Sequence, residues 1–286
     1  MNPKSLVENL NQLVSLPDVC IKVNQLLGSP DYSVSHIADI IIQDADISAR
    51  LLRLVNSPLY GQHIKVETVS RAITLLGANE LRNLIMATAA QSTFADIPDE
   101  LVNMEEFWRH SVTTGVMSQS LAKHCNTLHS ERLFVMGMLH DIGRLVMYLT
   151  IPKKARDILL ITGGDNWILA EVEQEILGFT HLDVGAELMR AWQLPDSFIE
   201  IAGLHNNPQM AKNFPLEASL VHIAKAIANG QIVGLSVDEM IWAINPFAWE
   251  TTSISANEVT AMVDDMQAKS DETMGLILAP AKYMHA

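Results

Sequence analysis

Apolar residues recur every three or four positions along nearly the whole chain, which is the spacing of one face of a helix. Leu6, Leu10 and Leu13 show this spacing near the beginning, and Pro17 then ends the segment. Later segments also end at glycine, proline or asparagine. No stretch alternates apolar and polar residues for long enough to predict a sheet. The pattern therefore predicts an all-α, multi-helical fold.

A polar break follows the first several short helices. Residues 94–100 read FADIPDE, where a proline stands among acidic side chains. We therefore predict an N-terminal helical subdomain over residues 1–95, a helical core over 96–235 and a C-terminal helical extension over 236–286.

Local signals also predict where two of the helices begin and end. Asp46 is placed to cap a helix whose Arg50 and Arg53 are expected to face water. A later helix over residues 216–229 is expected to stop at Gly230, because glycine commonly ends helices. Both boundaries are predictions from residue type alone.

The segment from Glu131 to Tyr148 is apolar on every side of a helical wheel, so it is predicted to be one central, buried helix. It nevertheless contains His140 and Asp141 side by side. An unpaired ionised carboxylate in a protein interior costs several kcal/mol, so a positive charge must compensate Asp141. A bound metal cation and the guanidinium of Arg144, one turn along the helix, are both candidates.

Composition narrows the classes of partner. The 286 residues include 19 basic and 33 acidic side chains, a net charge of −14, and no basic patch is evident, so neither nucleic acid nor an anionic membrane is expected as a partner. Cys20 and Cys125 are too few for a disulfide framework and indicate a reducing compartment. The chain has no leader-like or uninterrupted spanning segment, so a cytoplasmic location is expected.

Histidines on separate helices supply candidate chemistry. Helical folds often gather imidazole and carboxylate ligands from different helices into one interior metal site. A single histidine on an apolar helix is, however, more often a satisfied core residue. The candidates lie on four predicted helical segments: His110, His140 with Asp141, His181, and His205.

Several motifs of this chain resemble those of a known family. HDIG at 140–143, preceded by His110 and followed by HLDVG at 181–185 and HNNP at 205–208, resembles the HD-domain superfamily of metal-dependent phosphohydrolases. The earlier segments LPDVCIKVNQLL, IIQDADISARLLRLVNSPLYG and VSRAITLLGANELRNLIMA are similar to the HDOD group, the HD-related output domains of bacterial signalling proteins. This resemblance extends to about residue 230 and implies an HD-domain-like bundle.

The resemblance also implies roles for individual residues. His110, His140, Asp141, His181 and His205 would be metal ligands, and in catalytic relatives one or two divalent metals activate a water that attacks a phosphoester. If the protein is active, Asp141 and His140 are the residues closest to that chemistry.

Two departures from the superfamily pattern favour an inactive site. Lys225 stands where the superfamily supplies a closing aspartate, and an ammonium group there would repel a metal and could neutralise Asp141. His205 is followed by two asparagines, and no Gly-Tyr-Pro segment is present, so hydrolysis of cyclic di-GMP is poorly supported.

The sequence therefore predicts a regulatory HDOD module that lacks catalysis. Asp141 would be held by Lys225, Arg144 or both, no cofactor would be required, and one divalent metal could still bind. The expected partner is a separate signalling protein, and a small-molecule ligand is a second option. The alternative is a metal-dependent phosphohydrolase that uses the five ligands, with His222 replacing the lost aspartate.

A second motif carries a separate hypothesis. Asn56 and Ser57 form the NS segment that is characteristic of the HDOD group. Their polar turn can serve only to stop a helix, or it can bind a ligand, and both readings stay open at this point.

Overall fold

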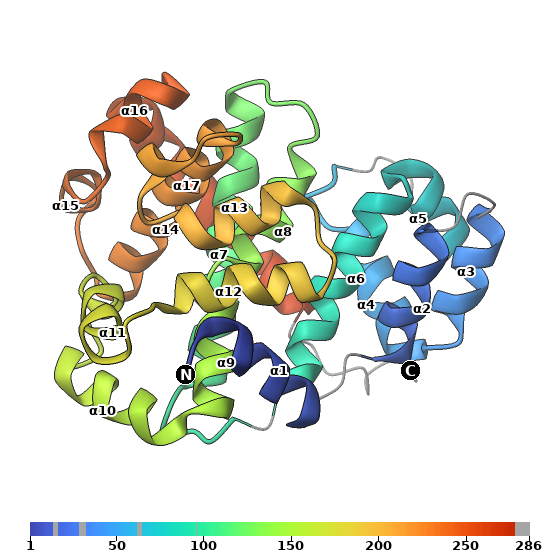
Figure 1. Ribbon diagram of the computed structural model, residues 1–286. Coiled ribbons are helices and arrows are strands. Elements are labelled where there is room, and N and C mark those ends of the chain that lie inside the picture. The colour runs from blue at the N-terminus through green and yellow to red at the C-terminus, as the bar shows by residue number, and fades with distance from the viewer. Residues whose placement is uncertain (14–16, 29–32, 62–64, 96, 278–286) are drawn as a thin grey trace. The chain divides into compact units, whose positions relative to one another are not determined.

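The computed structural model describes residues 1–13, 17–28, 33–61, 65–95 and 97–277 (Figure 1). Every regular element among them is a helix, so the predicted all-α fold is confirmed. The chain forms two compact units, each made of segments that are far apart in the sequence. Unit 1 comprises Met1–Val14 and Ala95–Asp264, and unit 2 comprises Ser15–Phe94 and Asp265–Ala286.

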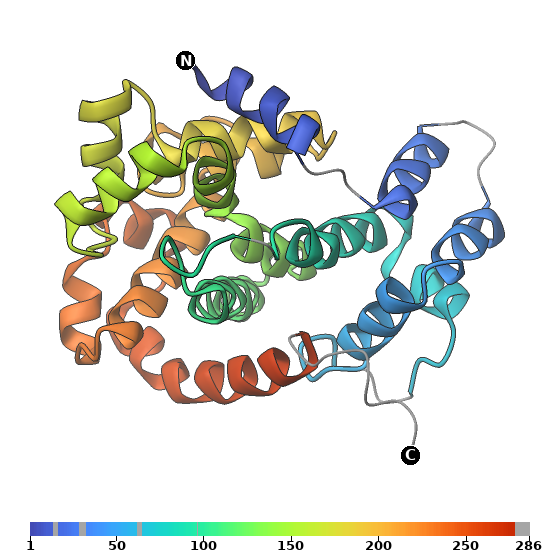
Figure 2. The same cartoon turned by 90° about the horizontal axis from the view of Figure 1, so that it is seen from below.

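The helices of unit 1 are α1 (Pro3–Leu13), α7 (Met104–His124), α8 (Glu131–Leu139), α9 (Ile142–Thr150), α10 (Pro152–Thr162), α11 (Leu169–Leu177), α12 (His181–Ala191), α13 (Asp196–Leu204), the 3-10 turn η1 (Pro208–Met210), α14 (Pro215–Ile232), α15 (Val237–Trp242) and α16 (Pro246–Thr252). Unit 2 contains α2 (Asp18–Leu27), α3 (Val34–Ile42), α4 (Ala45–Val55), α5 (Val69–Leu76) and α6 (Ala78–Thr93). The last helix, α17 (Ala256–Ile277), is continuous in Figure 2 and supplies residues to both units.

The first helix does not belong with the helices that follow it in the chain. α1 packs against α9 and α12 of unit 1, and Figures 1 and 2 both show it beside them. Leu6 and Leu10 are buried there. The two units therefore differ in membership from the three segments 1–95, 96–235 and 236–286, which stay a prediction about domains.

The centre of unit 1 is built from α7, α8 and α14, which pack on one another. α7 and α8 approach closely where Gly115 faces Gly137, since a Cβ added to Gly137 would lie 2.7 Å from the Cα of Gly115. Leu133, Phe134 and Leu139 of α8 are fully buried around this contact. Backbones this close bring the side chains of two helices into one interior site.

The prediction of a single helix from Glu131 to Tyr148 is wrong in one respect. The segment is central and buried, but α8 ends at Leu139 and α9 begins at Ile142, with a turn at His140 and Asp141. Asp141 has φ −102° and ψ 14°, outside the helical region, and its carbonyl accepts a bond from the Arg144 N–H at 3.0 Å. The turn directs both polar side chains inward from the end of a helix.

The same segment is long and apolar enough to cross a membrane by length and composition. In its most apolar window, within Glu131–Thr150, 83% of residues are buried inside the protein. A core helix of a globular domain has this character, and one such segment is weak evidence for a membrane span.

α9 and α12 also meet at a glycine. A Cβ added to Gly143 would lie 2.0 Å from the carbonyl oxygen of His181 and 2.5 Å from the Gly185 nitrogen, so no other residue fits. Gly143 follows Asp141 by two residues, and His181 is the first residue of α12. The HDIG glycine therefore allows His181 to approach Asp141.

In unit 2, the residue that caps α4 and the exposure of its two arginines both differ from the prediction. Asp44, and not Asp46, caps the helix by accepting a bond from the Ile47 N–H at 3.0 Å. Asp46 instead pairs with Arg50 at 2.8 Å, and Arg50 also donates to Gln91 of α6 at 2.8 Å. Arg50 and Arg53 are half-buried, so the expectation that they face water is wrong.

Gly230 also departs from its predicted role. α14 continues through it to Ile232. A Cβ at position 230 would lie 2.2 Å from the Met240 side chain of α15. Gly230 therefore leaves space for the Met240 side chain of α15, and it does not end α14.

Candidate functional site

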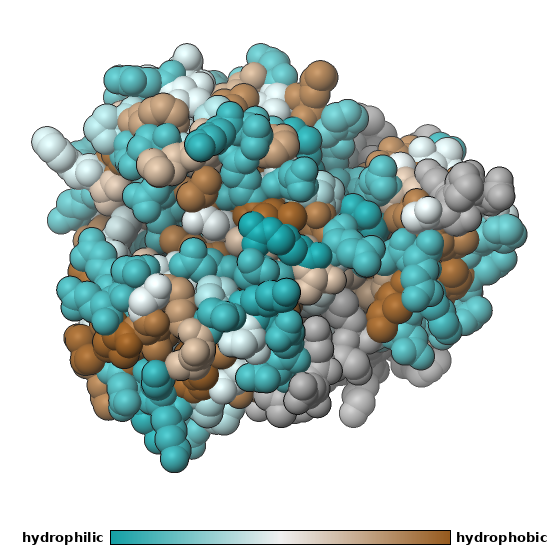
Figure 3. Space-filling model, viewed as in Figure 1, coloured by the Kyte–Doolittle hydropathy of each residue, from teal (hydrophilic) through white to brown (hydrophobic). Residues whose placement is uncertain are grey.

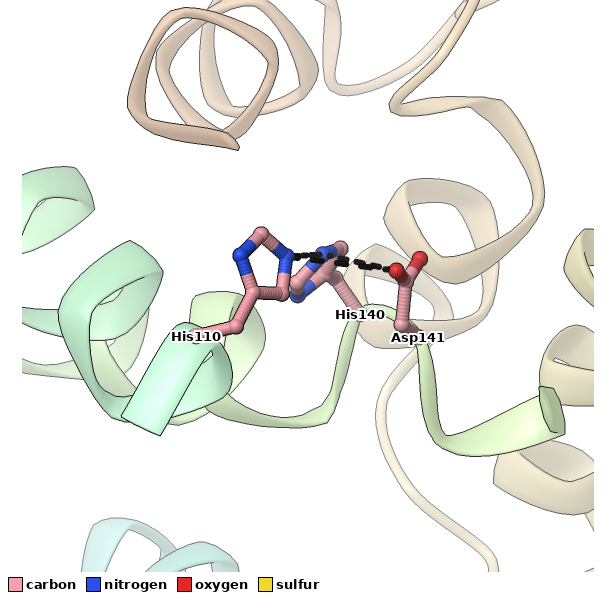
Figure 4. A group of neighbouring side chains, drawn as sticks. All are labelled: His110, His140 and Asp141. Atoms are coloured by element: carbon pink, nitrogen blue, oxygen red, sulfur yellow. Dashed lines mark hydrogen bonds and ion pairs between the residues drawn. The ribbon is translucent and has the colours of Figure 1, made fainter. Parts of the chain in front are cut away.

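Six predicted site residues meet in the interior of unit 1. His110 lies on α7, His140 and Asp141 form the turn between α8 and α9, and Figure 4 shows the two imidazoles and the carboxylate directed toward one another. All are buried, and Asp141 is only 2% exposed. The set is completed from three further elements by His181 at the start of α12, His205 at the end of α13 and Lys225 of α14.

The two oxygens of Asp141 face different groups. Oδ2 lies 3.4 Å from His140 Nε2, 4.0 Å from His110 Nε2 and 3.6 Å from Arg144 Nη1. Oδ1 lies 3.2 Å from Lys225 Nζ, 3.3 Å from His205 Nε2 and 3.4 Å from His181 Nε2. The carboxylate therefore divides the cluster into an Oδ2 side and an Oδ1 side.

Three of the histidines are oriented by groups behind them. His140 Nδ1 lies 2.6 Å from the Gly137 carbonyl, and His205 Nδ1 lies 3.0 Å from the Ile201 carbonyl. A carbonyl only accepts, so each Nδ1 carries the proton, and in the neutral ring each Nε2 presents a lone pair toward Asp141. Metal-binding histidines are held in this way.

Glu173 orients His181 and was not among the residues predicted from the sequence. Its Oε2 accepts from the His181 backbone N–H at 2.8 Å and lies 2.6 Å from His181 Nδ1. The carboxylate is 3% exposed on α11. It stands eight residues before His181 within no motif, so nothing in the sequence marks it beyond an acidic residue on a predicted helix.

Lys225 is held by three acceptors. Its Nζ is 3.2 Å from Asp141 Oδ1, 3.1 Å from His205 Nε2 and 2.9 Å from Asn206 Oδ1. Asn206 was noted in the sequence only because it replaces a histidine, and its contact with Lys225 was missed. Lys225 is 7% exposed, so the protein buries this residue beside Asp141.

Arg144 contributes a second positive charge at greater distance. Its Nη1 is 3.6 Å from Asp141 Oδ2, and its Nε donates to the Tyr148 hydroxyl at 3.2 Å. Lys225 therefore makes the shorter contact with the carboxylate, and Arg144 lies on the opposite oxygen.

The charges of the cluster follow from burial and proximity. Burial alone would raise the pKa of Asp141, but the positive charges of His140 in its protonated form and of Lys225 bring it well below its ordinary value. Burial lowers the pKa of His140, and burial with the Lys225 charge lowers the pKa of His205 to about 3. Because these imidazoles are neutral near pH 7, Lys225 and Arg144 supply the positive charge that Asp141 requires.

The pKa values of His181 and Lys225 shift in opposite directions from their ordinary values. Burial lowers the pKa of His181, but Glu173 and Asp141 outweigh burial and leave that pKa raised. The pKa of Lys225 is lowered, because burial exceeds the stabilisation by Asp141. The carboxylates and the lysine thus form one compensated network.

His222 does not replace the missing aspartate. Its Nδ1 lies 2.8 Å from the His205 carbonyl, and its Nε2 accepts the Asn245 backbone N–H at 3.0 Å. Both ring nitrogens are therefore used to join α14 to neighbouring backbone. The sixth ligand expected in the phosphohydrolase alternative is absent from this position.

The donor atoms around Asp141 fit one metal ion better than two. One ligand atom from each of His110, His140 and Asp141 lies within 4.8 Å of the others, so these three residues can hold an ion. On the Oδ1 side, His181 Nε2 is buried with no hydrogen-bond partner among the described residues, but Lys225 Nζ lies beside the same oxygen. The residues fit one ion on the Oδ2 side, whereas a second ion would meet an ammonium group.

The NS segment has a structural role in unit 2. The Asn56 amide donates to the carbonyls of Leu52 and Val66 at 2.7 and 2.8 Å, and its oxygen accepts the Val66 N–H at 2.7 Å. Asn56 thus has no amide hydrogen left for a ligand. Ser57 is 2% exposed, and its hydroxyl is equally unsuited to contact a ligand from solvent.

Solved structures with a similar fold come from several bacteria. A Shewanella amazonensis protein, provisionally assigned as a phosphohydrolase, matches with a TM-score of 0.73 and 24% identity over 95% of this chain and 97% of its own. An HDOD domain protein of unknown function from Geobacter sulfurreducens matches with a TM-score of 0.70 and 21% identity over 94% and 97%. A Marinobacter aquaeolei protein, provisionally assigned to signal transduction, matches with a TM-score of 0.66 and 19% identity over 93% and 60%. At these identities the likeness shows the fold alone.

Sequence comparison defines the family. An uncharacterised protein of Treponema pallidum is 25% identical over 205 residues, which are 71% of this chain and 39% of that protein, so the chain spans less than half of this relative. The sequence profile of the HDOD domain matches residues 13–208, which include the N-terminal helices, the His140-Asp141 turn and His205. The chain therefore belongs to the HDOD family.

Proposed function

We propose that this protein is a regulatory signalling module in which Lys225 takes the place of a metal cation beside Asp141, and that it acts by binding and not by catalysis. The observation that carries the proposal is the position of Lys225 Nζ, within 3.2 Å of Asp141 Oδ1, His205 Nε2 and Asn206 Oδ1. A cation bound at that oxygen would contact the same acceptors. The protein then requires no cofactor to stabilise its own interior.

A protein partner is supported by apolar side chains exposed on unit 1. Leu160 and Ile161 at the end of α10 are 75% and 62% exposed, and Trp167 before α11 is 41% exposed. Figure 3 shows hydrophobic surface over α10 and α11. Exposed apolar patches on soluble domains commonly mark interaction sites. The net charge of −14 supports neither nucleic acid nor an anionic membrane as the partner.

The proposed compartment is the cytoplasm of a bacterium. Cys20 and Cys125 are both free thiols, and Cys20 is buried. Free thiols persist where the environment is reducing. The bacterial sources of the structural relatives support the same assignment.

The second candidate function is metal-dependent phosphohydrolysis. It is favoured by the three histidines whose Nδ1 atoms are fixed and whose Nε2 atoms face Asp141, since a metal site needs such orientation. His110, His140 and Asp141 would hold one divalent ion, which when bound would supply Lewis-acid activation of water. His205 and Asp141 Oδ1 would remain engaged with Lys225, which is why this function ranks second.

The two functions are separated by metal analysis combined with a phosphodiesterase assay. The proteins to compare are wild type, Lys225→Asp, Asp141→Ala and, as a control, Lys269→Asp, which alters an exposed lysine paired with Asp265 on α17. Bis(p-nitrophenyl) phosphate and cyclic dinucleotides would be assayed with added Mn²⁺ or Mg²⁺. We expect no wild-type turnover, and at most one metal ion for each chain.

Each outcome bears on the proposal. Wild-type turnover that disappears in Asp141→Ala would overturn the regulatory function and establish the second candidate. Turnover that arises only in Lys225→Asp would support a site whose chemistry is blocked by the lysine. A second bound metal in Lys225→Asp, without turnover, would support the proposal that Lys225 occupies the place of a metal cation. It would also agree with a module that acts by binding.

A further inference from the structure

A cavity of about 500 Å³ lies within unit 2, and none of the residues that line it belongs to the Asp141 cluster. Its volume is within the range of sites that bind small organic molecules. The residues that line it come from the second half of α4, the segment before α5 and the end of α17. They are Ala49, Leu52, Arg53, Asn56, Lys65, Val66, Glu67, Glu272 and Leu276.

Two buried nitrogens of Arg53 in this cavity have no hydrogen-bond partner in the part of the chain that the structure describes. Its Nε and Nη2 atoms are each exposed by less than 1 Å² and form no hydrogen bond with any described residue. Arg50, one turn earlier, forms an ion pair with Asp46 and donates a hydrogen bond to Gln91. The two arginines of α4 therefore differ in the polar partners that the described residues give them. Buried donors without acceptors are costly, and a guanidinium fits the oxygens of a carboxylate or phosphate.

The wall beside Arg53 is preformed. Asn56 joins the Leu52 carbonyl at the end of α4 to both backbone groups of Val66, through the three hydrogen bonds described above. Leu52 and Val66 are therefore held in place without a ligand. A preformed site loses less conformational entropy when a ligand binds.

The other charged residues lie at the solvent side of the cavity. Lys65, Glu67 and Glu272 are exposed, whereas Leu52 and Leu276 are half-buried and Val66 is buried. The carboxylates of Glu67 and Glu272 repel anions, although solvent screens this repulsion because both side chains are exposed. They therefore oppose the entry of a polyanion more than that of a molecule with a single anionic group. The lining thus combines apolar walls, a mixed rim and a half-buried guanidinium, two nitrogens of which are buried with no partner among the described residues.

We propose that this cavity binds a small amphipathic anion, in which a carboxylate or phosphate pairs with Arg53 and an aliphatic part lies between Leu52, Val66 and Leu276. The proposal goes beyond the function assigned to the Asp141 cluster and does not depend on it. The NS segment then serves the site indirectly, because Asn56 positions the wall.

The test uses three probes that share one aliphatic chain: octanoate, mono-octyl phosphate and 1-octanol. Binding to the full chain would be measured by isothermal titration calorimetry, and the site would be located by NMR shifts of the Ala49, Leu52, Val66 and Leu276 methyl groups. We expect one or both anions to bind with these shifts, and octanol to bind about tenfold more weakly or worse. The tighter anion identifies whether a carboxylate or a phosphate is preferred.

Two variants and one control make the test specific. Arg53→Met keeps the apolar length of the side chain and should weaken anion binding about tenfold or more, with octanol unchanged. Leu276→Ser alters a half-buried wall residue and should weaken all three probes. Arg71→Met changes an exposed arginine of the same unit and should alter none.

Three results would overturn the proposal. They are the absence of anion binding at millimolar concentration, equal binding of octanoate and octanol to wild type, and equal anion binding by wild type and Arg53→Met. If Arg53→Met fails to fold, Leu276→Ser and the methyl shifts still decide whether the ligand occupies this cavity.

Discussion

Two charged side chains in this protein, one in each compact unit, differ in whether the chain supplies them with partners. Asp141 of unit 1 is approached within 3.6 Å by Lys225 and Arg144, and four histidines surround it. Arg53 of unit 2 has two buried guanidinium nitrogens with no acceptor among the described residues. In unit 1 the chain itself neutralises the buried charge, whereas in unit 2 no described residue accepts a hydrogen bond from the two buried nitrogens of Arg53.

The difference indicates where a ligand can gain binding energy. A ligand that enters beside Asp141 must displace an internal ammonium group and leave Lys225 or Asp141 without its partner. An anion beside Arg53 would supply an acceptor to two buried nitrogens that have none among the described residues. The family's histidine cluster is thus the more recognisable site, while the cavity of unit 2 is the better prepared to receive a small molecule.

The largest effect is expected from Lys225→Met. This change leaves Asp141 buried without its nearest cation, so the free energy of unfolding should fall by roughly 3–5 kcal/mol. Urea denaturation in the presence of a chelator measures it, and Lys269→Met is the control, because Lys269 is in an exposed pair within α17. The double variant Lys225→Met/Asp141→Asn should recover most of the loss. A loss under about 1 kcal/mol would instead show that Arg144 alone suffices.

The second prediction concerns how the Asp141 cluster is assembled. Gly143→Ala places a Cβ against the His181 carbonyl and the Gly185 nitrogen, so α9 and α12 must separate. We expect the free energy of unfolding to fall by about 3 kcal/mol, near the upper range for overpacked cores. Gly203→Ala is the matched control on α13, since its Cβ would meet the Ala186 side chain at an ordinary 3.5 Å. Equal losses in the two variants would contradict the proposed contact.

The sequence was informative about unit 1 because its motifs report directly on geometry. Periodicity predicted the helices, and the spacing of His110, His140, Asp141, His181 and His205 on separate helices is consistent with their meeting in one place. It could not reveal Glu173 or Asn206. Their roles depend on which residues α11 and α13 bring near His181 and Lys225, and that is decided by packing between helices and not by local pattern.

Errors in local structure have the same origin. At the break between α8 and α9, His140 and Asp141 turn toward interior partners, although the apolar pattern around them favours one continuous helix. The reading of Asn56 as a candidate ligand group failed to foresee its bonds to Val66, ten residues away. The role of a polar residue in a turn depends on what lies opposite, and the chain alone does not specify it.

The third prediction is a dependence of stability on pH. Burial lowers the pKa of His222 to about 4, and its ring donates to the His205 carbonyl and accepts from Asn245. Below pH 6.5 the unfolded chain therefore takes up a proton that the folded chain resists, so stability falls as the pH falls toward 4. At pH 5 this contribution is about 2 kcal/mol relative to pH 7.

His222→Gln tests that assignment. The variant lacks the titrating group, so its free energy of unfolding should change less between pH 7 and pH 5 than that of wild type, by about 2 kcal/mol. His36→Gln is the control, because it makes the same substitution at an exposed histidine of α3. Identical pH profiles for wild type and His222→Gln would assign the acid sensitivity to the histidines around Asp141 instead.

The smallest effect on stability is expected from Arg53→Met, and it completes the contrast with Lys225→Met. Two of the guanidinium nitrogens have no acceptor within the described ranges, so their removal should change the free energy of unfolding by less than about 0.5 kcal/mol, or raise it slightly. Thermal and urea unfolding of the same samples used for ligand titration would measure this change. Arg50→Met, which breaks the bonds to Asp46 and Gln91, should be more destabilising. A loss of about 2 kcal/mol or more in Arg53→Met would mean that the chain supplies its own acceptor, and the two charges would then be alike.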